Sequence, residues 1–277
     1  MTEMSKRTVL VLGGTGKTGR RVVAGLQEKG IAVRVGSRSA TPRFDWDDEQ
    51  SWAGALDGVD AVYVSYYPDL LMPEAEGRIG AFSSLAVAAG VKRLVLLSGR
   101  GEAGAERCEE AVKATGADWT VIRASWFAQN FDEGVLLEPI RNGEVMLPVG
   151  AVGEPFVHAD DIAEVAVLAL SQDGHSGATY ELTGPRLLSF AQAIGEIDAA
   201  LVHDVRYVQI SDQDFAKGLA ELPAALTGVL MELFTEILDG RNESVTHDIE
   251  RLTGHKARDF STYVRETAAT GIWGAAK

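Results

Sequence analysis

The sequence predicts an α/β protein built on a Rossmann-type, doubly wound parallel sheet, with a smaller C-terminal α+β lobe. Two observations lead to this class. Over the first 123 residues, apolar strand-like runs alternate with helix-like segments, and such alternation indicates a parallel sheet covered by helices on both faces. The first strand also runs directly into a glycine-rich turn and a helix, which is the arrangement of a dinucleotide-binding unit.

The elements of this first part follow from local patterns. Short apolar runs predict strands at residues 8–12, 31–36, about 42–45, 60–65, 93–97 and 118–123. Apolar residues at helical spacing predict helices at residues 17–29, 49–56, 74–89 and 105–115. Because such sheets bind ligands at the carboxyl ends of their strands, we expect the functional residues at those ends.

Beyond residue 130 the alternation becomes irregular. Helices are expected near 133–141, through 162–170 and over 212–240, and short strands or extended pieces at 143–148, 156–158, 180–183 and 205–210. No linker separates two independent domains. We therefore expect residues 1–130 to form an NADP-binding Rossmann domain and residues 131–277 to form a smaller, substrate-covering lobe packed on it.

The glycine-rich turn carries the strongest functional signal. Gly13, Gly16 and Gly19 fall in a G-x-x-G-x-x-G spacing, which suits a tight turn, backbone approach to a pyrophosphate, and close packing of helix on sheet. A triphosphate-binding P-loop is excluded because it requires a glycine at the position of Val11. The predicted cofactor-binding residues of this turn are Gly13, Gly14, Thr15, Gly16, Lys17, Thr18 and Gly19.

The end of the second strand favours NADP(H) over NAD(H). NAD-binding members of this fold place an acidic residue there, whereas this chain has Ser37 and Arg38, which can bind a 2′-phosphate. The first 43 residues also carry a net charge of +7 in a chain of net charge −14. Asp45 and Trp46 can flank the adenine, although a buried tryptophan at the sheet edge is an equal alternative. Ser65, at the end of the fourth expected strand, completes the cofactor set.

Composition excludes several other classes. The acidic balance argues against nucleic acid and anionic membranes as partners. No apolar run is long enough for a membrane span, and no apolar core precedes the first strand as in a secretory signal. Cys108 is the only cysteine, so no internal disulfide can form and a cytoplasmic location is expected, with Cys108 as inert helix filler. A monomer or a homodimer is equally compatible with these patterns.

Six segments carry a resemblance to a known family: the glycine turn and residues 58–62, 90–98, 119–130, 155–163 and 180–185. In these segments the chain resembles the NmrA-like branch of the atypical short-chain dehydrogenases/reductases, in particular bacterial relatives of the ergot-alkaloid reductases (the agroclavine dehydrogenase-like group). This resemblance implies binding of NAD(P). It implies the reaction less narrowly, because the branch includes quinone reductases, iminium reductases and redox-sensing proteins without turnover.

The usual proton-transfer pair of short-chain dehydrogenases is absent from the sequence. None of the six tyrosines has a lysine four residues further on, although Ser98 stands where the helper serine is expected. A reaction that needs orientation and a hydride but little acid–base help fits this pattern, as with an iminium or a quinone. Ser98 and Tyr66 are the predicted catalytic residues, and the phenol of Tyr66 can also donate a proton.

Planar substrates suit the aromatic residues near the strand ends. Tyr67, Trp126 and Phe127 are the predicted substrate-binding residues, and core packing is an equal alternative for the last two. We expect His158 to be a packed residue and Asp160 or Asp161 to cap the following helix. The adjacent Glu109 and Glu110 are expected on a solvated helix face. No side-chain spacing suggests a metal.

The function expected from these patterns is that of an NAD(P)H-dependent oxidoreductase that transfers a hydride to a planar small molecule of the iminium or quinone type, in secondary metabolism. A non-catalytic NADP(H)-binding redox sensor or regulatory protein is the alternative, since both would keep the same cofactor turn.

Overall fold

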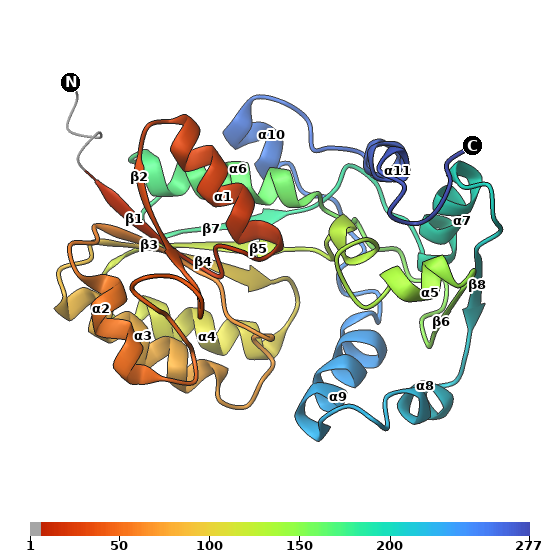
Figure 1. Ribbon diagram of the computed structural model, residues 1–277, viewed down its shortest axis with the longest axis horizontal. Helices are drawn as coiled ribbons and strands as arrows, with labels where there is room; N and C mark the ends of the chain where they lie inside the picture. The colour runs from red at the N-terminus through yellow and green to blue at the C-terminus, as the bar shows by residue number, and fades with distance from the viewer. Residues whose placement is uncertain (1–6) are drawn as a thin grey trace. The chain divides into compact units, whose positions relative to one another are not determined.

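The computed structural model describes residues 7–277, which form two compact units (Figure 1). The first comprises the chain up to Ala124 together with Ala159–Glu181, and the second comprises Ser125–His158 and Leu182–Lys277. The division is therefore discontinuous and differs from the single boundary expected at residue 130. Residues 159–181 belong to the first unit because they supply a strand to its sheet, which local sequence patterns do not reveal.

The first unit is built on a six-stranded sheet with the strand order β2-β1-β3-β4-β5-β7. The strands are β1 (Thr8–Leu12), β2 (Ala32–Gly36), β3 (Ala61–Val64), β4 (Arg93–Gly99), β5 (Asp118–Ala124) and β7 (Ala178–Leu182). The pairs from β2 to β5 are all parallel. The chain passes from β1 to β2 on one side and to β3 on the other, so the strand order reverses beside β1. Such a reversal is where doubly wound folds open a ligand crevice.

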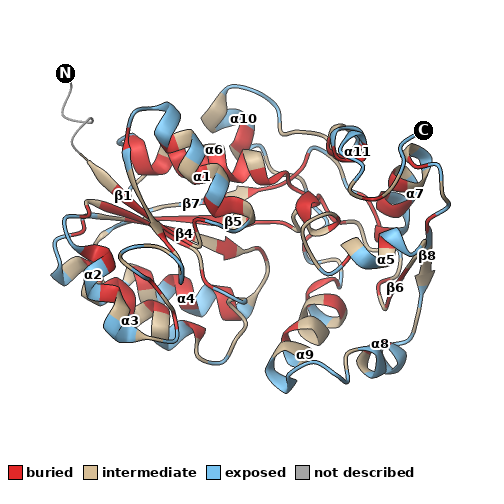
Figure 2. Cartoon of the chain, viewed as in Figure 1, coloured by how far each residue is buried: buried red, intermediate tan, exposed pale blue. Residues whose placement is uncertain are grey.

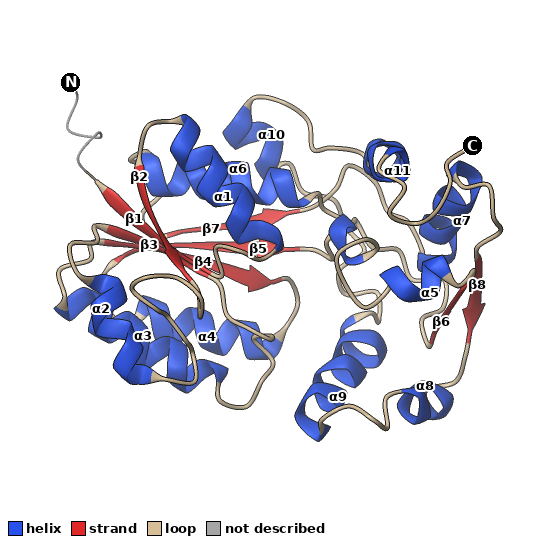
Figure 3. Cartoon of the chain, in the orientation of Figure 1, coloured by secondary structure: helices blue, strands red, loops and turns tan. Residues whose placement is uncertain are grey.

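Helices cover both faces of this sheet, as the alternation predicts (Figure 3). They are α1 (Lys17–Glu28), α2 (Trp52–Leu56) after a short 3-10 turn (Glu49–Ser51), α3 (Ala75–Ala88), α4 (Ala103–Lys113) and α6 (Ala159–Ser171). Helices α1 and α6 pack against each other on one face, and α3 and α4 do so on the other (Figure 1). The class predicted from the sequence, a doubly wound α/β fold, is confirmed.

The strand expected at about 42–45 does not form. The backbone N–H of Phe44 donates to the carbonyl of Ser37 (2.9 Å), and that of Asp45 donates to the Ser51 hydroxyl (3.0 Å). The segment is a loop whose apolar side chains are buried: Phe44 and Trp46 pack with one another at 5.1 Å between ring centroids. Its apolar pattern therefore reflects burial in a loop rather than strand pairing.

The second unit is an α+β assembly around a parallel pair of strands, β6 (Glu144–Leu147) and β8 (Arg206–Gln209). Its helices are α5 (Leu137–Arg141), α7 (Phe190–Ala200), α8 (Asp212–Gly218), α9 (Ala224–Met231), a π-helical turn (Glu232–Ile237), α10 (Asp248–Thr253), α11 (Phe260–Ala269) and a 3-10 turn (Ala128–Asn130). The single helix expected over 212–240 is broken between α8 and α9. Pro223 stands at the N-cap of α9, where it lacks the N–H needed to continue a helix from the preceding turn.

Each unit has its own core. In the first, β1 and β4 are largely buried between the two helical layers, as Figure 2 shows. In the second, an aromatic cluster that includes Phe131, Phe156 and Phe190 fills the interior. Within residues 7–277, no helix has the length and apolar character needed to cross a membrane.

Candidate active site

The turn after β1 is a tight loop that leads into the first helix. Gly13 adopts a left-handed backbone conformation (φ +61°), which favours glycine, and the N–H of Gly16 donates to the carbonyl of Gly13 at 2.8 Å. Helix α1 begins at Lys17, and its N-cap Gly16 provides no side chain to cap the first turn. The first N–H groups of a helix have no partner within it, so this end is suited to an anion.

Two glycines of the turn have no room for a side chain, and a third has little. A Cβ on Gly19 would lie 2.1 Å from the carbonyl oxygen of Gly13, and one on Gly14 would lie 2.9 Å from Val35 Cγ1. A Cβ on Gly16 would lie 3.2 Å from the same Gly13 oxygen. Thr15 and Gly16 are exposed. The backbone thus forms an open cradle that fits the pyrophosphate of a dinucleotide.

Two turn residues are held by the surrounding structure. The Thr18 hydroxyl accepts a hydrogen bond from the buried Tyr63 hydroxyl (3.0 Å), so this side chain ties α1 to β3. Because Thr18 is the acceptor in this bond, its hydroxyl keeps its own proton for another acceptor. The carbonyl of Lys17 accepts from Arg21, whose Nε also pairs with Asp160 at 2.5 Å.

The ends of β2 and β3 bring two predicted residues together. Arg38 is exposed, and its guanidinium carbon lies 5.9 Å from the ring centroid of Tyr67, which is 69% exposed. Ser65 lies beside the glycine turn, because a Cβ on Gly13 would be 3.5 Å from its hydroxyl oxygen. The Ser37 hydroxyl lies 3.3 Å from that of Ser39. Residues from three neighbouring strand ends therefore gather at one edge of the sheet.

Asp45 and Trp46 are both held within the protein. The Asp45 carboxylate accepts from Arg43 at 2.5 Å. The Trp46 indole is buried and donates to the carbonyl of Ser65 (3.1 Å). This geometry is expected if Trp46 is a buried residue at the edge of the sheet rather than a contact for the adenine.

Tyr66 is buried in an aromatic cluster of the first unit, which also contains Phe44, Trp46, Trp52 and Phe82. It is 8% exposed, its ring centroid lies 4.9 Å from that of Trp46, and its hydroxyl accepts from Arg78 Nη1 at 3.3 Å. Burial raises the pKa of Tyr66, and the Arg78 hydrogen bond only partly offsets this. The phenol is therefore protonated at neutral pH.

Ser98 belongs to a buried charged network that the sequence analysis did not anticipate. Its hydroxyl donates to Glu109 Oε1 (2.7 Å), and the Glu109 carboxylate also accepts from Arg123 Nε (2.8 Å) and Nη2 (2.7 Å). Burial alone would raise the pKa of Glu109, but the hydrogen bonds from Arg123 and Ser98 and nearby positive charges lower it below its ordinary value. Glu109 is thus a buried carboxylate, paired with Arg123.

The expectation that Glu109 lies on a solvated helix face is wrong. The buried residues of α4 include Ala105, Cys108, Glu109 and Val112, a spacing that places Glu109 on the inward stripe. This spacing was readable in the sequence. Its neighbour Glu110 is exposed, as expected.

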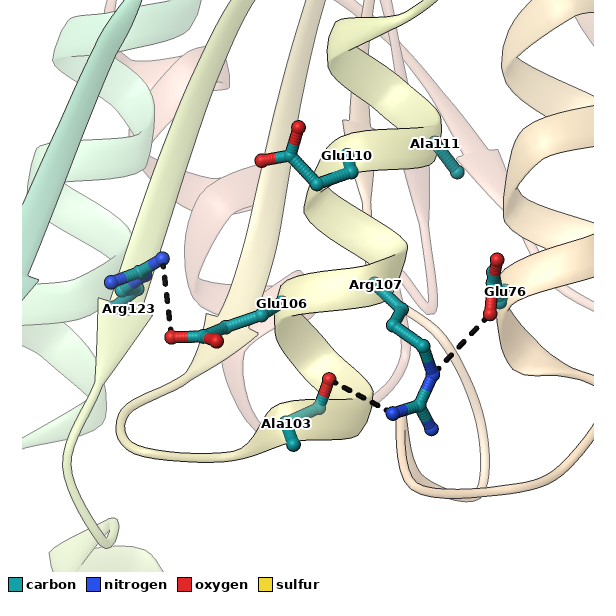
Figure 4. Close-up of a pocket in the computed structure, with 7 residues that line it drawn as sticks. All are labelled: Glu76, Ala103, Glu106, Arg107, Glu110, Ala111 and Arg123. Atoms are coloured by element: carbon teal, nitrogen blue, oxygen red, sulfur yellow. Dashed lines mark hydrogen bonds and ion pairs between the residues drawn. The ribbon is translucent and has the colours of Figure 1, made fainter.

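The groove in Figure 4 lies elsewhere on the first unit. It has a volume of about 540 Å³ and is lined by Glu76, Ala103, Glu106, Arg107, Glu110, Ala111 and Arg123. Opposite charges across it pair with each other, as in Arg107 Nε to Glu76 Oε2 (3.3 Å) and Arg123 Nη2 to Glu106 Oε1 (3.7 Å). It includes no residue of the glycine turn, and we do not assign a ligand to it.

The remaining candidates lie in or near the second unit. The Trp126 ring packs against those of Phe190 and Phe234, at centroid distances of 5.4 and 4.8 Å, and Phe127 is half-buried. His158 is buried with its Nε2 3.0 Å from Gln129 Nε2, as expected of a packed residue.

The capping role expected for Asp160 or Asp161 is wrong. Helix α6 begins at Ala159, so both carboxylates lie inside its first turn rather than at the N-cap. There they still stabilise the positive end of the helix. Asp160 forms the ion pair with Arg21 described above.

A parallel sheet with a glycine cradle at the strand-order reversal defines a dinucleotide-binding fold of the Rossmann type. A family model described as NAD(P)H-binding matches residues 13–173. The chain belongs to this NAD(P)H-binding family, in agreement with its sequence resemblance to the NmrA-like branch.

Three relatives match nearly the whole chain. Prestalk A differentiation protein A of Dictyostelium discoideum is 30% identical, covering 95% of this chain and 93% of its own length. The NAD(P)H azoreductase of Xenophilus azovorans is 30% identical, with coverage of 94% and 98%. Agroclavine dehydrogenase of Claviceps fusiformis is 28% identical, with coverage of 96% and 98%.

Solved structures share the same fold. The NADPH-dependent quinone oxidoreductase of Escherichia coli, complexed with NADPH, superposes with a TM-score of 0.75 at 22% identity, covering 94% of this chain and 99% of that one. The negative transcriptional regulator Nmra superposes with a TM-score of 0.72 at 17% identity, with coverage of 96% and 97%. The fold is therefore shared by a reductase and by a regulator.

Proposed function

We propose that this protein is an NADPH-dependent reductase that transfers a hydride to a planar small molecule of the iminium or quinone type. The observation that carries this proposal is the hydrogen bond from Ser98 to the buried Glu109. The one hydroxyl proton at the helper-serine position is already donated within the protein, and no tyrosine–lysine pair stands beside it. Substrates that need little proton transfer fit such a site best.

The cofactor would be held by the glycine turn and by the ends of β2 and β3. The turn's backbone N–H groups and the positive end of α1 would bind the pyrophosphate. Arg38 would bind the 2′-phosphate, with Ser37 beside it. Among the described residues no carboxylate pairs with Arg38, whereas the nearby Arg43 is occupied by Asp45 and Asp48. This difference supports Arg38 as the phosphate ligand and NADP(H) as the preferred cofactor.

The chemistry requires positioning more than acid–base help. When bound, the nicotinamide supplies a hydride. An iminium carbon that accepts the hydride becomes an amine without further protonation, whereas a quinone also takes up one proton to become the hydroquinone. Tyr66 is protonated, and because its hydroxyl accepts from Arg78 it keeps a proton to donate. Because Tyr66 is buried, solvent water is the first candidate for the proton donor and Tyr66 is the second.

The proposal is tested by mixing the purified protein with NADPH and a panel of quinones and cyclic iminium ions, while the absorbance of NADPH is followed. NADPH deuterated at the hydride position is expected to yield an iminium-derived amine that carries the deuterium. The matched control is Gly16→Val, which fills the cradle and should abolish the reaction.

The names of the relatives, which include an azoreductase and a clavine dehydrogenase, support turnover of this class. No consumption of NADPH with any substrate, together with strong discrimination between NADP⁺ and NADPH in binding, would instead favour the sensor alternative.

A further inference from the structure

We propose that Tyr67 is a positioning residue. Its ring orients the Arg38 side chain for binding the 2′-phosphate of NADPH. This inference rests on the proposed function, because it assumes that Arg38 is the phosphate ligand. It moves Tyr67 from the substrate pocket, where the sequence analysis placed it, to the adenosine end of the cofactor site. The same residue would then determine the choice between NADPH and NADH.

The neighbouring tyrosines have opposite environments. Tyr66 is buried and packs on Trp46, whereas Tyr67 is 69% exposed. Tyr67 lies in a bend three residues beyond the end of β3. An exposed aromatic ring contributes little to folding. Its presence at a strand end is better explained by contact with another group there.

That group is Arg38. The guanidinium carbon lies 5.9 Å from the Tyr67 ring centroid, which is within the range of a cation–π contact. Other nearby arginines have different partners: Arg34 donates to the carbonyls of Ala55 and Asp57, and Arg43 pairs with two carboxylates. A carboxylate on Arg38 would compete with a phosphate, whereas an aromatic face does not.

The chemistry of a guanidinium explains why this contact would help binding. The N–H donors of arginine lie in the plane of the group, while a ring contacts its face. Tyr67 can therefore restrict the motion of Arg38 and leave its donors directed to a phosphate. Prior ordering of a flexible side chain reduces the entropic cost of binding.

Sheet topology places this pair on the cofactor side. Strands β2 and β3 flank β1 and run parallel to it, so their carboxyl ends meet at the edge that carries the glycine turn. The side chain of Ser65, two residues before Tyr67, lies beside Gly13. Arg38 and Tyr67 thus belong to the same edge as the cradle.

The test compares Tyr67→Leu with the conservative variant Tyr67→Phe. Dissociation constants are measured for NADPH and NADH by fluorescence, and for 2′,5′-ADP by calorimetry. We expect Tyr67→Leu to weaken NADPH and 2′,5′-ADP by about two- to fivefold, the usual value of an exposed cation–π contact, and to leave NADH unchanged. Tyr67→Phe keeps the ring and should bind all three like the parent protein.

A double-mutant cycle separates this inference from the proposed function. In an Arg38→Ala background, Tyr67→Leu should have no further effect on the ratio of NADPH to NADH affinity. Equal weakening of NADPH and NADH, or a raised substrate KM with unchanged cofactor binding, would overturn the role assigned to Tyr67. If Arg38→Ala itself leaves NADPH binding intact, the cofactor preference in the proposed function fails, and the inference fails with it.

Discussion

The hydroxyl of Ser98 donates a hydrogen bond to the fully buried carboxylate of Glu109, 2.7 Å away. Ser98 lies on β4 and Glu109 on α4, and Arg123 on β5 completes the network from the neighbouring strand. A residue expected from its sequence position to help catalysis is therefore part of the structural connection between a helix and two strands.

Glu109→Gln should destabilise the protein by about 3 kcal/mol, because it removes the buried negative charge that pairs with Arg123. This is the low end for a broken buried pair, since Arg123 keeps Glu106 and Glu181 within 4 Å. Urea unfolding at neutral pH measures the change. The adjacent Glu110→Gln is the control. Glu110 forms only a surface pair with Lys113, so its substitution should cost under about 1 kcal/mol.

The effect of Glu109 should also depend on pH. Its pKa is lower in the folded than in the unfolded protein, so its stabilisation is complete above the unfolded pKa and is lost as the pH falls through the folded pKa. The difference in stability between the parent protein and Glu109→Gln should therefore shrink in acid. A difference that stays constant into acid would show that the ionised carboxylate is not the stabilising form.

Gly19→Ala should prevent the turn from closing and abolish binding of NADPH, because the new Cβ would lie 2.1 Å from the Gly13 carbonyl. Fluorescence titration and thermal unfolding measure both effects. Gly77→Ala in α3 is the control, since nothing lies within 4 Å of its Cβ. Loss of glycine from that helix should stabilise the protein by about 0.5–1 kcal/mol. Normal NADPH binding by Gly19→Ala would contradict the proposal that the glycine turn binds the pyrophosphate.

Arg38→Ala should weaken NADPH binding by about 1–3 kcal/mol and leave NADH binding nearly unchanged, because only NADPH carries the 2′-phosphate. Titration of both cofactors gives the answer. Lys29→Ala removes the same charge at the other end of α1 and serves as the electrostatic control. Equal losses in the two variants would mean that general charge, not a phosphate contact, is responsible.

Tyr66→Phe and Ser98→Ala should each lower kcat by about 10- to 100-fold at most, at or below the usual contribution of one general acid. Steady-state kinetics with the best substrate of the panel measures this, and NADPH titration shows whether each variant still binds cofactor. A Tyr66→Phe variant that binds NADPH normally but has no activity would identify Tyr66 as an essential proton donor. The proposal that the reaction depends on positioning rather than on acid–base catalysis would then be wrong.

Cys108 should resist thiol reagents in the folded protein at mildly alkaline pH. Burial raises the pKa of its thiol to about 12, so almost none of the reactive thiolate is present. Labelling is measured with and without denaturant, and Cys108→Ala provides the blank. Modification of the native protein at the rate of the unfolded chain would contradict this prediction.

The fold class, the glycine turn and most elements of the first unit can be predicted from the sequence alone. These features are local: the turn depends on glycine at fixed spacing, and each strand or helix on a short periodic pattern. The sequence also placed Ser37, Arg38, Ser65 and Tyr67 correctly at strand ends. Because the carboxyl ends of parallel strands lie at the same edge of a sheet, their position at strand ends predicts that these residues share one edge.

Which side chains contact one another depends on the tertiary fold. It recruited residues 159–181 into the first unit, joined Ser98 to Glu109 and Arg123, buried Tyr66 and set Arg38 over Tyr67. These outcomes depend on contacts between residues distant in sequence. The free energy of a buried charge or ring is set by those neighbours rather than by its own segment.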